Sequence, residues 1–390
     1  MGGKQETLRF WLITGSTLAV LLVGLGFTVT HFVLQAQMER FAERFELLSS
    51  LRKQALQEYF DTAWAEITFW SLNEGLLDKQ ADLRKRWDIK RENKGDPGAM
   101  LQQLYVDNNP FPHGERHQLQ DAGDGSDYSA LHAELHPLTE LFVVERGYYD
   151  LFLIGPEGDV FYSVEKEADF GTNLNTGPWR ETGLADVFRR ALASARDGRV
   201  VFSDFESYGP SADEPALFMA RAVTGAEGEV LGVLALQLPT ERIDSIMRFT
   251  AGMGQSGETY LVGEDLLMRS DSRFSETSTN LKVRVDTASV KRALAGESGA
   301  IFTTDYRGVT VLSAFNSIDI DHFRWAVMAE IDEDEVLHTI ANRRPMIAGL
   351  MFGLYSLAMW SIWYIRPGDW GEGEGLAALD LDAEHSDIVG

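Results

Sequence analysis

An internal repeat in the middle of the chain constrains its fold more than any other feature. The first copy opens with "YDLFLIGPEGDVFYSV" (Tyr149 to Val164) and the second with "ETYLVGEDLLMRSDSR" (Glu258 to Arg273). Each opening reads as an apolar strand, a turn and a second, alternating strand. A short amphipathic helix and three further strands follow in both copies. This pattern predicts an α+β fold with two tandem five-stranded antiparallel sheets, each carrying helices on one face.

Two apolar segments without charged residues bracket this repeat. They are "FWLITGSTLAVLLVGLGFTVTHFVL" (10–34) and "MIAGLMFGLYSLAMWSIWYI" (346–365). Each is long enough to cross the hydrocarbon core of a bilayer, and the second ends in aromatic residues of the kind that favour the headgroup level. We expect two transmembrane helices; a cleaved signal peptide for the first and a buried core helix for either are the alternatives.

Large domains cross a membrane largely regardless of their charge, so the basic residues near the segment ends do not decide the orientation. We expect a two-pass protein of a bacterial inner membrane, with both termini in the cytoplasm and the central region outside it. The N-terminal flank carries Lys4 and Arg9, whereas Arg343 and Arg344 argue for the opposite orientation.

A long helical pattern precedes the repeat and continues directly out of the first apolar segment. Apolar residues recur three or four positions apart from Gln37 to Leu77, which predicts a helix that packs along both modules or forms a dimer. A polar stretch rich in Gly and Pro predicts loops from Asn93 to Ser126, before a helix that begins near Tyr128. The expected divisions are a cytoplasmic N-terminus (1–9), a first transmembrane helix (10–34), the long helix with the loop-rich region (37–147), a membrane-distal module (148–250) and a membrane-proximal module (251–341). A second transmembrane helix (346–365) and an acidic cytoplasmic tail (366–390) follow.

The composition excludes several classes of function. The formal net charge is −25, and Lys and Arg never gather into a stripe, so we expect no nucleic-acid partner. The chain has no cysteine, which removes disulfides, thiolate metal sites and cysteine nucleophiles. No nucleophile elbow, phosphate-binding loop, kinase signature or cyclase signature is found, so we expect neither an enzyme nor a cofactor.

The order of these segments resembles a known family of bacterial receptors. A membrane helix, a long helix, two PAS-like modules and a second membrane helix, with "EKEADFGTNL" and "GETYLVGEDLLMRSDSRF", resemble the double Cache sensor region of chemoreceptors, sensor kinases and receptor cyclases. The resemblance covers roughly 37–341. It implies that the membrane-distal module holds a small ligand and that the proximal module relays the signal.

One departure from the family bears on the ligand. The resemblance implies that members of this family that bind amino acids carry an acidic residue on the last strand of the distal module. This chain has Gln237 at that position. A neutral amide is a weaker partner for an ammonium group than a carboxylate is. We therefore expect a small polar or anionic ligand rather than an α-amino acid.

Candidate ligand-binding residues come from the distal module. Aromatic walls with a few convergent polar groups are typical of a small-molecule site, although each residue could equally be core, turn or surface. The candidates are Tyr162, Lys166, Asp169, Asn173, Trp179, Asp204, Tyr208, Phe218 and Gln237.

Two pairs of histidines have a spacing that could serve a metal. His113 and His117, and His132 and His136, are four residues apart, which would place both rings of a pair on one helix face. The first pair lies in a loop rich in Pro and Gly. We expect solvated surface histidines and no metal site.

The expected function is extracytoplasmic sensing of a small molecule, with the signal passed through the membrane to a separate partner protein. The residues after Ile365 form an acidic tail with no recognisable output domain. The alternatives are an accessory or structural subunit that uses this region for protein contact, and a receptor that lost its output part. A homodimer and contact with membrane lipid are also expected.

Overall fold

The computed structural model describes residues 2–92, 96–341 and 344–365. Its internal contacts divide the chain into two units. One unit comprises Met1–Glu39 together with Leu337–Gly390, and the other comprises Arg40–Val336. The expected acidic tail lies outside the described residues.

The first unit contains the two charge-free segments. Helix α1 (Gly2–Ser71) carries the first and α9 (Arg344–Ile365) carries the second, and both are long and apolar enough to cross a membrane. A Cβ added at Gly26 would lie 3.6 Å from Met351 of α9, and one added at Gly15 would lie 3.4 Å from the Tyr355 hydroxyl. An added Cβ at either position would make ordinary van der Waals contact, so α1 and α9 pack side by side at these two glycines.

The second unit begins with the remainder of α1 and a group of shorter helices. The long helical pattern is interrupted after Ser71, where the Asn73 side chain accepts a hydrogen bond from the amide of Leu76 at 3.0 Å and starts a new helix. The elements that follow are α2 (Glu74–Glu92), α3 (Pro97–Leu101), the π-helix Gln102–Asp107 and α4 (Asp127–Arg146). The sequence predicted loops over 93–126, so α3 and the π-helix are a correction. Asp96 supplies the missing signal, because its side chain caps α3 at the amide of Ala99.

The first sheet is antiparallel and has the strand order β2-β1-β6-β5-β3, with β4 paired to β5. Its elements are β1 (Asp150–Ile154), β2 (Val160–Ser163), α5 (Gly183–Ala193), β3 (Val200–Phe202), β4 (Glu206–Tyr208), β5 (Glu214–Thr224) and β6 (Val230–Leu238). Helix α5 packs on one face over Phe152, Phe218 and Ala235. The other face, with Leu151, Leu153 and Leu236, packs in a core shared with α1, α2 and α4.

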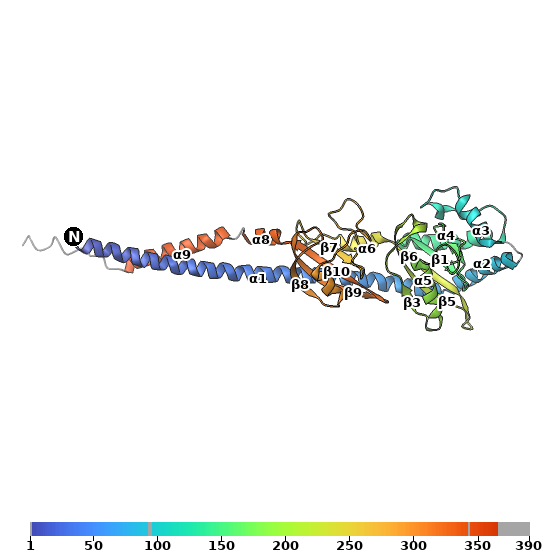
Figure 1. Cartoon of the computed structure of the whole chain (residues 1–390), viewed down its shortest axis with the longest axis horizontal. Coiled ribbons are helices and arrows are strands. Elements are labelled where there is room, and N and C mark those ends of the chain that lie inside the picture. Colours follow the sequence, from blue (N-terminus) through green and yellow to red (C-terminus); the bar gives the residue numbers. More distant parts are fainter. Residues whose placement is uncertain (1, 93–95, 342–343, 366–390) are drawn as a thin grey trace, which may run out of the picture. The chain divides into compact units, whose positions relative to one another are not determined.

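The second sheet is also antiparallel, with the order β7-β10-β9-β8. The remaining elements are α6 (Thr240–Met247), β7 (Glu258–Val262), α7 (Ala288–Leu294), β8 (Gly299–Thr304), β9 (Thr310–Ile320), β10 (Phe323–Asp332) and α8 (Glu333–Ala341). Figure 1 shows both sheets lying beside the part of α1 that belongs to the second unit, which begins at Arg40. The tandem antiparallel sheets predicted from the repeat are therefore present.

The strand counts differ from the expected five in each sheet: the first has six strands and the second has four. In the first sheet, one predicted strand is divided into β3 and β4, because the Ser203 hydroxyl accepts the Phe218 amide hydrogen and replaces a ladder bond. In the second sheet, the predicted strand after β7 makes only isolated bridges, such as Val262 with Met268. Leu266 has a φ of 67°, which is incompatible with a continuous strand.

Equivalent residues at the start of the first strand are paired in the same way in each sheet. Asp150 of β1 lies opposite Gln237 of β6, which lies opposite Phe218 of β5. In the second sheet Glu258 of β7 lies opposite Glu330 of β10, which lies opposite Ser313 of β9. The repeat therefore places equivalent rows of three residues at the same position in each sheet.

Candidate functional site

A buried carboxylate fixes the loop that leaves β2. Asp150 accepts hydrogen bonds from the amides of Val164 at 2.8 Å and Glu165 at 3.1 Å, and from the Ser163 hydroxyl at 2.7 Å. Lys166 then has a φ of 57°, a left-handed conformation that is strained in a residue other than glycine. The following residues, "EADF", lead back to β2, where the Gly171 amide donates to the Val160 carbonyl at 2.9 Å.

Aromatic side chains surround Asp169 in this loop. The Tyr208 hydroxyl donates to Asp169 Oδ2 at 2.5 Å, and the Tyr208 ring lies 4.8 Å from the Phe218 ring and 6.5 Å from the Trp179 ring. Trp179 is only half-buried, and its indole nitrogen donates to the Ala168 carbonyl at 3.2 Å. Its ring packs on Gly209, where an added Cβ would lie 2.8 Å from Cζ3. These three rings form the aromatic wall of the candidate site.

A second carboxylate, Glu167, lies in the same cluster. Tyr149 donates its hydroxyl to Glu167 Oε1 at 2.7 Å, and Ser211 donates to Oε2 at 2.6 Å. Gln237 donates from Nε2 to the Ser211 hydroxyl at 3.2 Å, which connects the last strand to this carboxylate. His113 Nε2 lies 2.9 Å from Glu167 Oε1.

The cluster is electrostatically unusual because two acids are buried together. Burial raises the pKa of Asp169 to about 6. Burial, followed by the charge of Asp169, raises the pKa of Glu167 to about 8. Asp169 Oδ1 and Gln237 Oε1 are both buried without a hydrogen-bond partner. The site therefore presents unused acceptors, which an N–H group of a ligand could satisfy.

The structure brings five of the nine candidate residues together. Asp169, Trp179, Tyr208, Phe218 and Gln237 belong to this cluster, which we call the distal cluster together with Tyr149, Glu167 and Ser211.

The other four candidates lie elsewhere. Lys166 Nζ contacts the Val164 carbonyl and His136 Nε2, and the Tyr162 hydroxyl contacts His136 Nδ1 at 2.7 Å, so both side chains face α4. Asn173 donates to Asp159 in a half-exposed turn. Asp204 pairs with Arg269 and accepts from the Trp325 indole nitrogen, which joins the loop after β3 to the second sheet.

Sequence reasoning missed Glu167, Tyr149 and Ser211. A signal for Glu167 was present, because the phrase "EKEADF" alternates acids directly after a buried strand. Ser211 offered none, since it is placed by the turn after β4 in which Ala212 and Asp213 have positive φ.

The expectation of solvated histidines is wrong for His132 and His136. Both are fully buried on the inner face of α4, and their rings stack with centroids 4.6 Å apart. Burial lowers the pKa of both rings, to about 3 for His136, with the Lys166 charge as the next cause in each. They are therefore neutral at physiological pH. The cause is tertiary, because the loop before α4 covers this face and Gln120 contributes its carbonyl to His132 at 2.6 Å.

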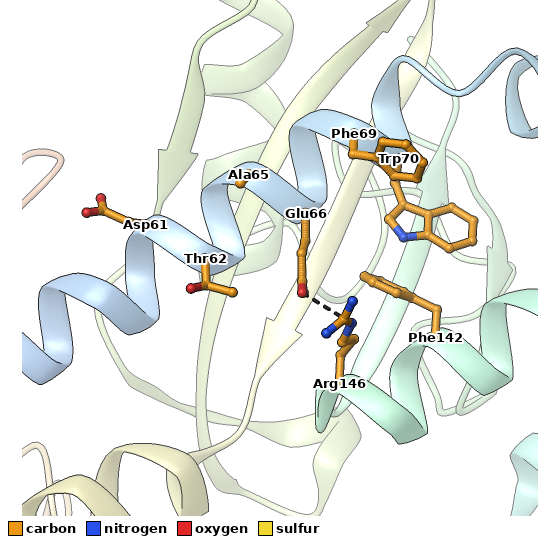
Figure 2. Close-up of a pocket in the computed structure, with 8 residues that line it drawn as sticks. All are labelled: Asp61, Thr62, Ala65, Glu66, Phe69, Trp70, Phe142 and Arg146. Carbon is orange, nitrogen blue, oxygen red and sulfur yellow. Dashed lines mark ion pairs between the residues drawn. The ribbon is translucent and has the colours of Figure 1, made fainter.

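Helices α1 and α4 also form an open groove of about 710 Å³ (Figure 2). Arg146 forms an ion pair with Glu66 at 3.2 Å along this groove. The Trp70 and Phe142 rings stand 4.7 Å apart at one end, and Phe69 beside them is 64% exposed. The lining residues are Asp61, Thr62, Ala65, Glu66, Phe69, Trp70, Phe142 and Arg146.

Comparison with known proteins places these features in a family. A probable chemoreceptor, y4sI, of Sinorhizobium fredii (strain NBRC 101917 / NGR234) is 25% identical over 233 residues, which is 60% of this chain. The match spans 28% of that protein's length.

Solved structures with a similar fold include two chemoreceptor domains. The sensory domain of Campylobacter jejuni Tlp3 (CcmL) is 12% identical, with a TM-score of 0.47, over 78% of this chain and 98% of that one. The ligand-binding domain of Pseudomonas fluorescens CtaA, solved with L-serine, is 16% identical, with a TM-score of 0.36, over 71% of this chain and 99% of that one.

The family model of the Cache domain (dCache_1) matches residues 35–340, a range that contains both sheets and the distal cluster. Cache domains of this kind sense ligands in chemoreceptors and sensor kinases, and no catalytic domain is indicated over the matched residues. The repeat, the paired antiparallel sheets and this match agree, so the chain belongs to the dCache_1 family of Cache domains.

Proposed function

We propose that residues Arg40–Val336 form an extracytoplasmic sensor that binds a small ligand at the distal cluster. The observation that carries this proposal is the pair of buried acceptors without partners, Asp169 Oδ1 and Gln237 Oε1, beside an aromatic wall. A buried acceptor left unpaired costs roughly 1–3 kcal/mol, and a ligand that donates to both would recover that free energy. Membership of a sensor family supports this assignment.

The chemistry of the cluster favours a ligand with a positive charge. The sequence predicted a polar or anionic ligand because Gln237 replaces an acid, but Glu167 and Asp169 supply two carboxylates in its place. When ionised, these carboxylates would repel an anion, whereas an ammonium group would be stabilised by them and would favour their ionised form. We therefore propose a small amine without a carboxylate group, which keeps the expectation that the ligand is not an α-amino acid.

Calorimetry on the full chain in lipid nanodiscs tests this proposal. Titration with small amines such as ethanolamine, choline and putrescine should give saturable binding, and titration with succinate or acetate should not. Asp169→Asn should weaken amine binding by roughly tenfold or more, because one charged acceptor is lost. Glu181→Gln is the matched control, since this nearby carboxylate is 86% exposed. Binding of anions alone would overturn the proposed ligand class.

We propose further that the charge-free parts of α1 and α9 span the membrane, with both termini in the cytoplasm. Their length and apolar composition support this. The native chain has no cysteine, so a single Glu297→Cys substitution offers one exposed thiol in the second sheet region. A membrane-impermeant maleimide should label it in intact spheroplasts. Labelling only after lysis would contradict this topology.

The accessory-subunit alternative has one specific observation in its favour. The groove in Figure 2 exposes Phe69, and Leu141 of α4 nearby is 56% exposed, as a protein-contact surface would require. That hypothesis predicts a stoichiometric partner that co-purifies with the wild-type chain and is lost in a Phe69→Asp, Leu141→Asp variant. The separate protein that receives the signal stays a prediction.

A further inference from the structure

The second sheet contains a buried acidic cluster in the position that corresponds to the distal cluster. Glu258 of β7 and Glu330 of β10 lie directly opposite each other, and Asp305 adds a third carboxylate from the turn between β8 and β9. One oxygen of each carboxylate can be chosen so that all three lie within 4.8 Å of one another. The exposed fractions of Glu258, Glu330 and Asp305 are 0%, 0% and 6%.

The charges in this cluster are not balanced by the side chains around it. Arg307 pairs with Asp305 at 2.6 Å and also with Asp332 at 2.7 Å, at the rim of the cluster. When all three carboxylates are ionised, they and one guanidinium carry a net charge of about −2, and like charges directly opposite each other on a sheet are destabilising. Burial accordingly raises the pKa of Glu258, and that of Glu330 to about 7, so protons and a cation compete for this cluster. A divalent cation would bring this sum to zero.

Hydroxyl groups surround the carboxylates, but the hydrogen bonds among them leave gaps. Ser313 donates to Glu330 Oε1 at 2.6 Å, and Tyr306 donates to Glu258 Oε1 at 2.9 Å. The fully buried Tyr260 hydroxyl lies beside Glu330 and acts on its pKa as a hydrogen-bonding neighbour, although neither this hydroxyl nor Glu330 Oε2 has a partner at full hydrogen-bond geometry. The Tyr260 hydroxyl and Glu330 Oε2 therefore lie side by side in this region, and their mutual contact falls short of full hydrogen-bond geometry.

We propose that Glu258, Asp305 and Glu330 bind a calcium ion in the second module. Ca²⁺ takes oxygen ligands at about 2.3–2.6 Å, so two oxygens on opposite sides of an ion at about 2.4 Å lie about 4.8 Å apart. Each of the three carboxylates offers one oxygen to this group, and water would complete the coordination. Five of the six carboxylate oxygens also accept a hydrogen bond from the surrounding protein, and Glu330 Oε2 is the sixth. Mg²⁺ fits less well because it keeps several waters and is seldom held by protein groups alone. The sequence predicted no metal site, since these acids come from three separate strands and turns.

The expected affinity is that of an extracellular calcium module, with a Kd on the order of 10⁻⁴ M. The test uses the full chain in nanodiscs, with thermal unfolding followed in EGTA and in millimolar Ca²⁺. Calcium should raise the melting temperature of the wild-type chain and bind saturably in calorimetry. Tb³⁺ in place of Ca²⁺ should show luminescence sensitised through Tyr260 and Tyr306, whose rings lie 5.6 Å apart.

Glu330→Gln should weaken Ca²⁺ binding by about 10- to 100-fold and remove the calcium-dependent rise in melting temperature. Because Gln keeps the shape and relieves the repulsion, its melting temperature in EGTA should equal or exceed that of the wild type. Glu297→Gln, on a 52% exposed carboxylate in the same module, should bind Ca²⁺ as the wild type does. No saturable Ca²⁺ binding by the wild-type chain would overturn the proposal, as would unchanged binding by Glu330→Gln or binding of an organic amine at this cluster.

Discussion

At the scale of single residues, the protonation of Glu167 should set part of the pH dependence of stability. Its pKa rises from 4.5 to about 8 on folding, so the folded state binds more protons between these values and the free energy of unfolding falls as pH rises. Between pH 6 and 8 this contribution is up to roughly 1.4 kcal/mol per pH unit. Glu167→Gln should make the decline shallower in that window, measured by urea unfolding. Glu181→Gln should keep the wild-type slope.

The same protonation should control amine binding. An ammonium group is bound by ionised carboxylates. Asp169, with a pKa of about 6, is partly protonated below neutral pH, and Glu167, with a pKa of about 8, stays mostly protonated up to neutral pH. Affinity for the amine should therefore rise from pH 6 to pH 8, as measured by calorimetry in buffers of matched ionic strength. An affinity that falls over this range would contradict the proposed ligand class.

Gly209 should decide how far Trp179 closes over the distal cluster. A Cβ at this position would lie 2.8 Å from the indole ring, a separation that forces the ring to move. Gly209→Ala should reduce affinity for the amine by several-fold and shift the tryptophan emission spectrum, with little change in the free energy of unfolding. Gly228→Ala controls for the loss of a glycine, because a Cβ there meets nothing within 4 Å. Gly228 has a φ of 83°, unlike Gly209, so this control carries a backbone strain that Gly209→Ala lacks.

At the scale of secondary-structure elements, one buried guanidinium contributes to the connection between the two sheets. Arg269 is 3% exposed and pairs with Asp204, which also accepts from Trp325 at 2.8 Å. Asp204→Asn should lower the free energy of unfolding by about 2 kcal/mol, because a hydrogen-bonded charge is weakened while its partner stays buried. Asp265→Asn is the matched comparison. It removes a 47% exposed partner of the same arginine and should cost less than about 1 kcal/mol.

At the scale of the whole molecule, the chain carries a formal net charge of −25, which favours self-repulsion in the compact state. Sodium chloride screens this repulsion, so the melting temperature should rise between low and moderate salt. The calcium effect proposed above is separate, because it should saturate at constant ionic strength and disappear in Glu330→Gln. A melting temperature that falls with added salt would show that attractive ion pairs outweigh the net repulsion.

Local pattern in the sequence determined the two charge-free helices, the duplicated sheets and the family. Periodicity and turn residues report on neighbours in sequence, and both copies of the repeat carry the same pattern. The pattern also identified Asp169, Trp179 and Tyr208 as candidates, because they follow predicted strands of the distal module.

The tertiary structure alone decided which polar residues lie together inside. His132 and His136 read as surface residues and are buried, while Glu167 joins Gln237 through Ser211 across three separate elements. Glu258 meets Glu330 only because β7 and β10, far apart in sequence, are neighbours in the sheet. Burial and charge proximity depend on contacts between distant segments, and no local spacing in the sequence encodes them.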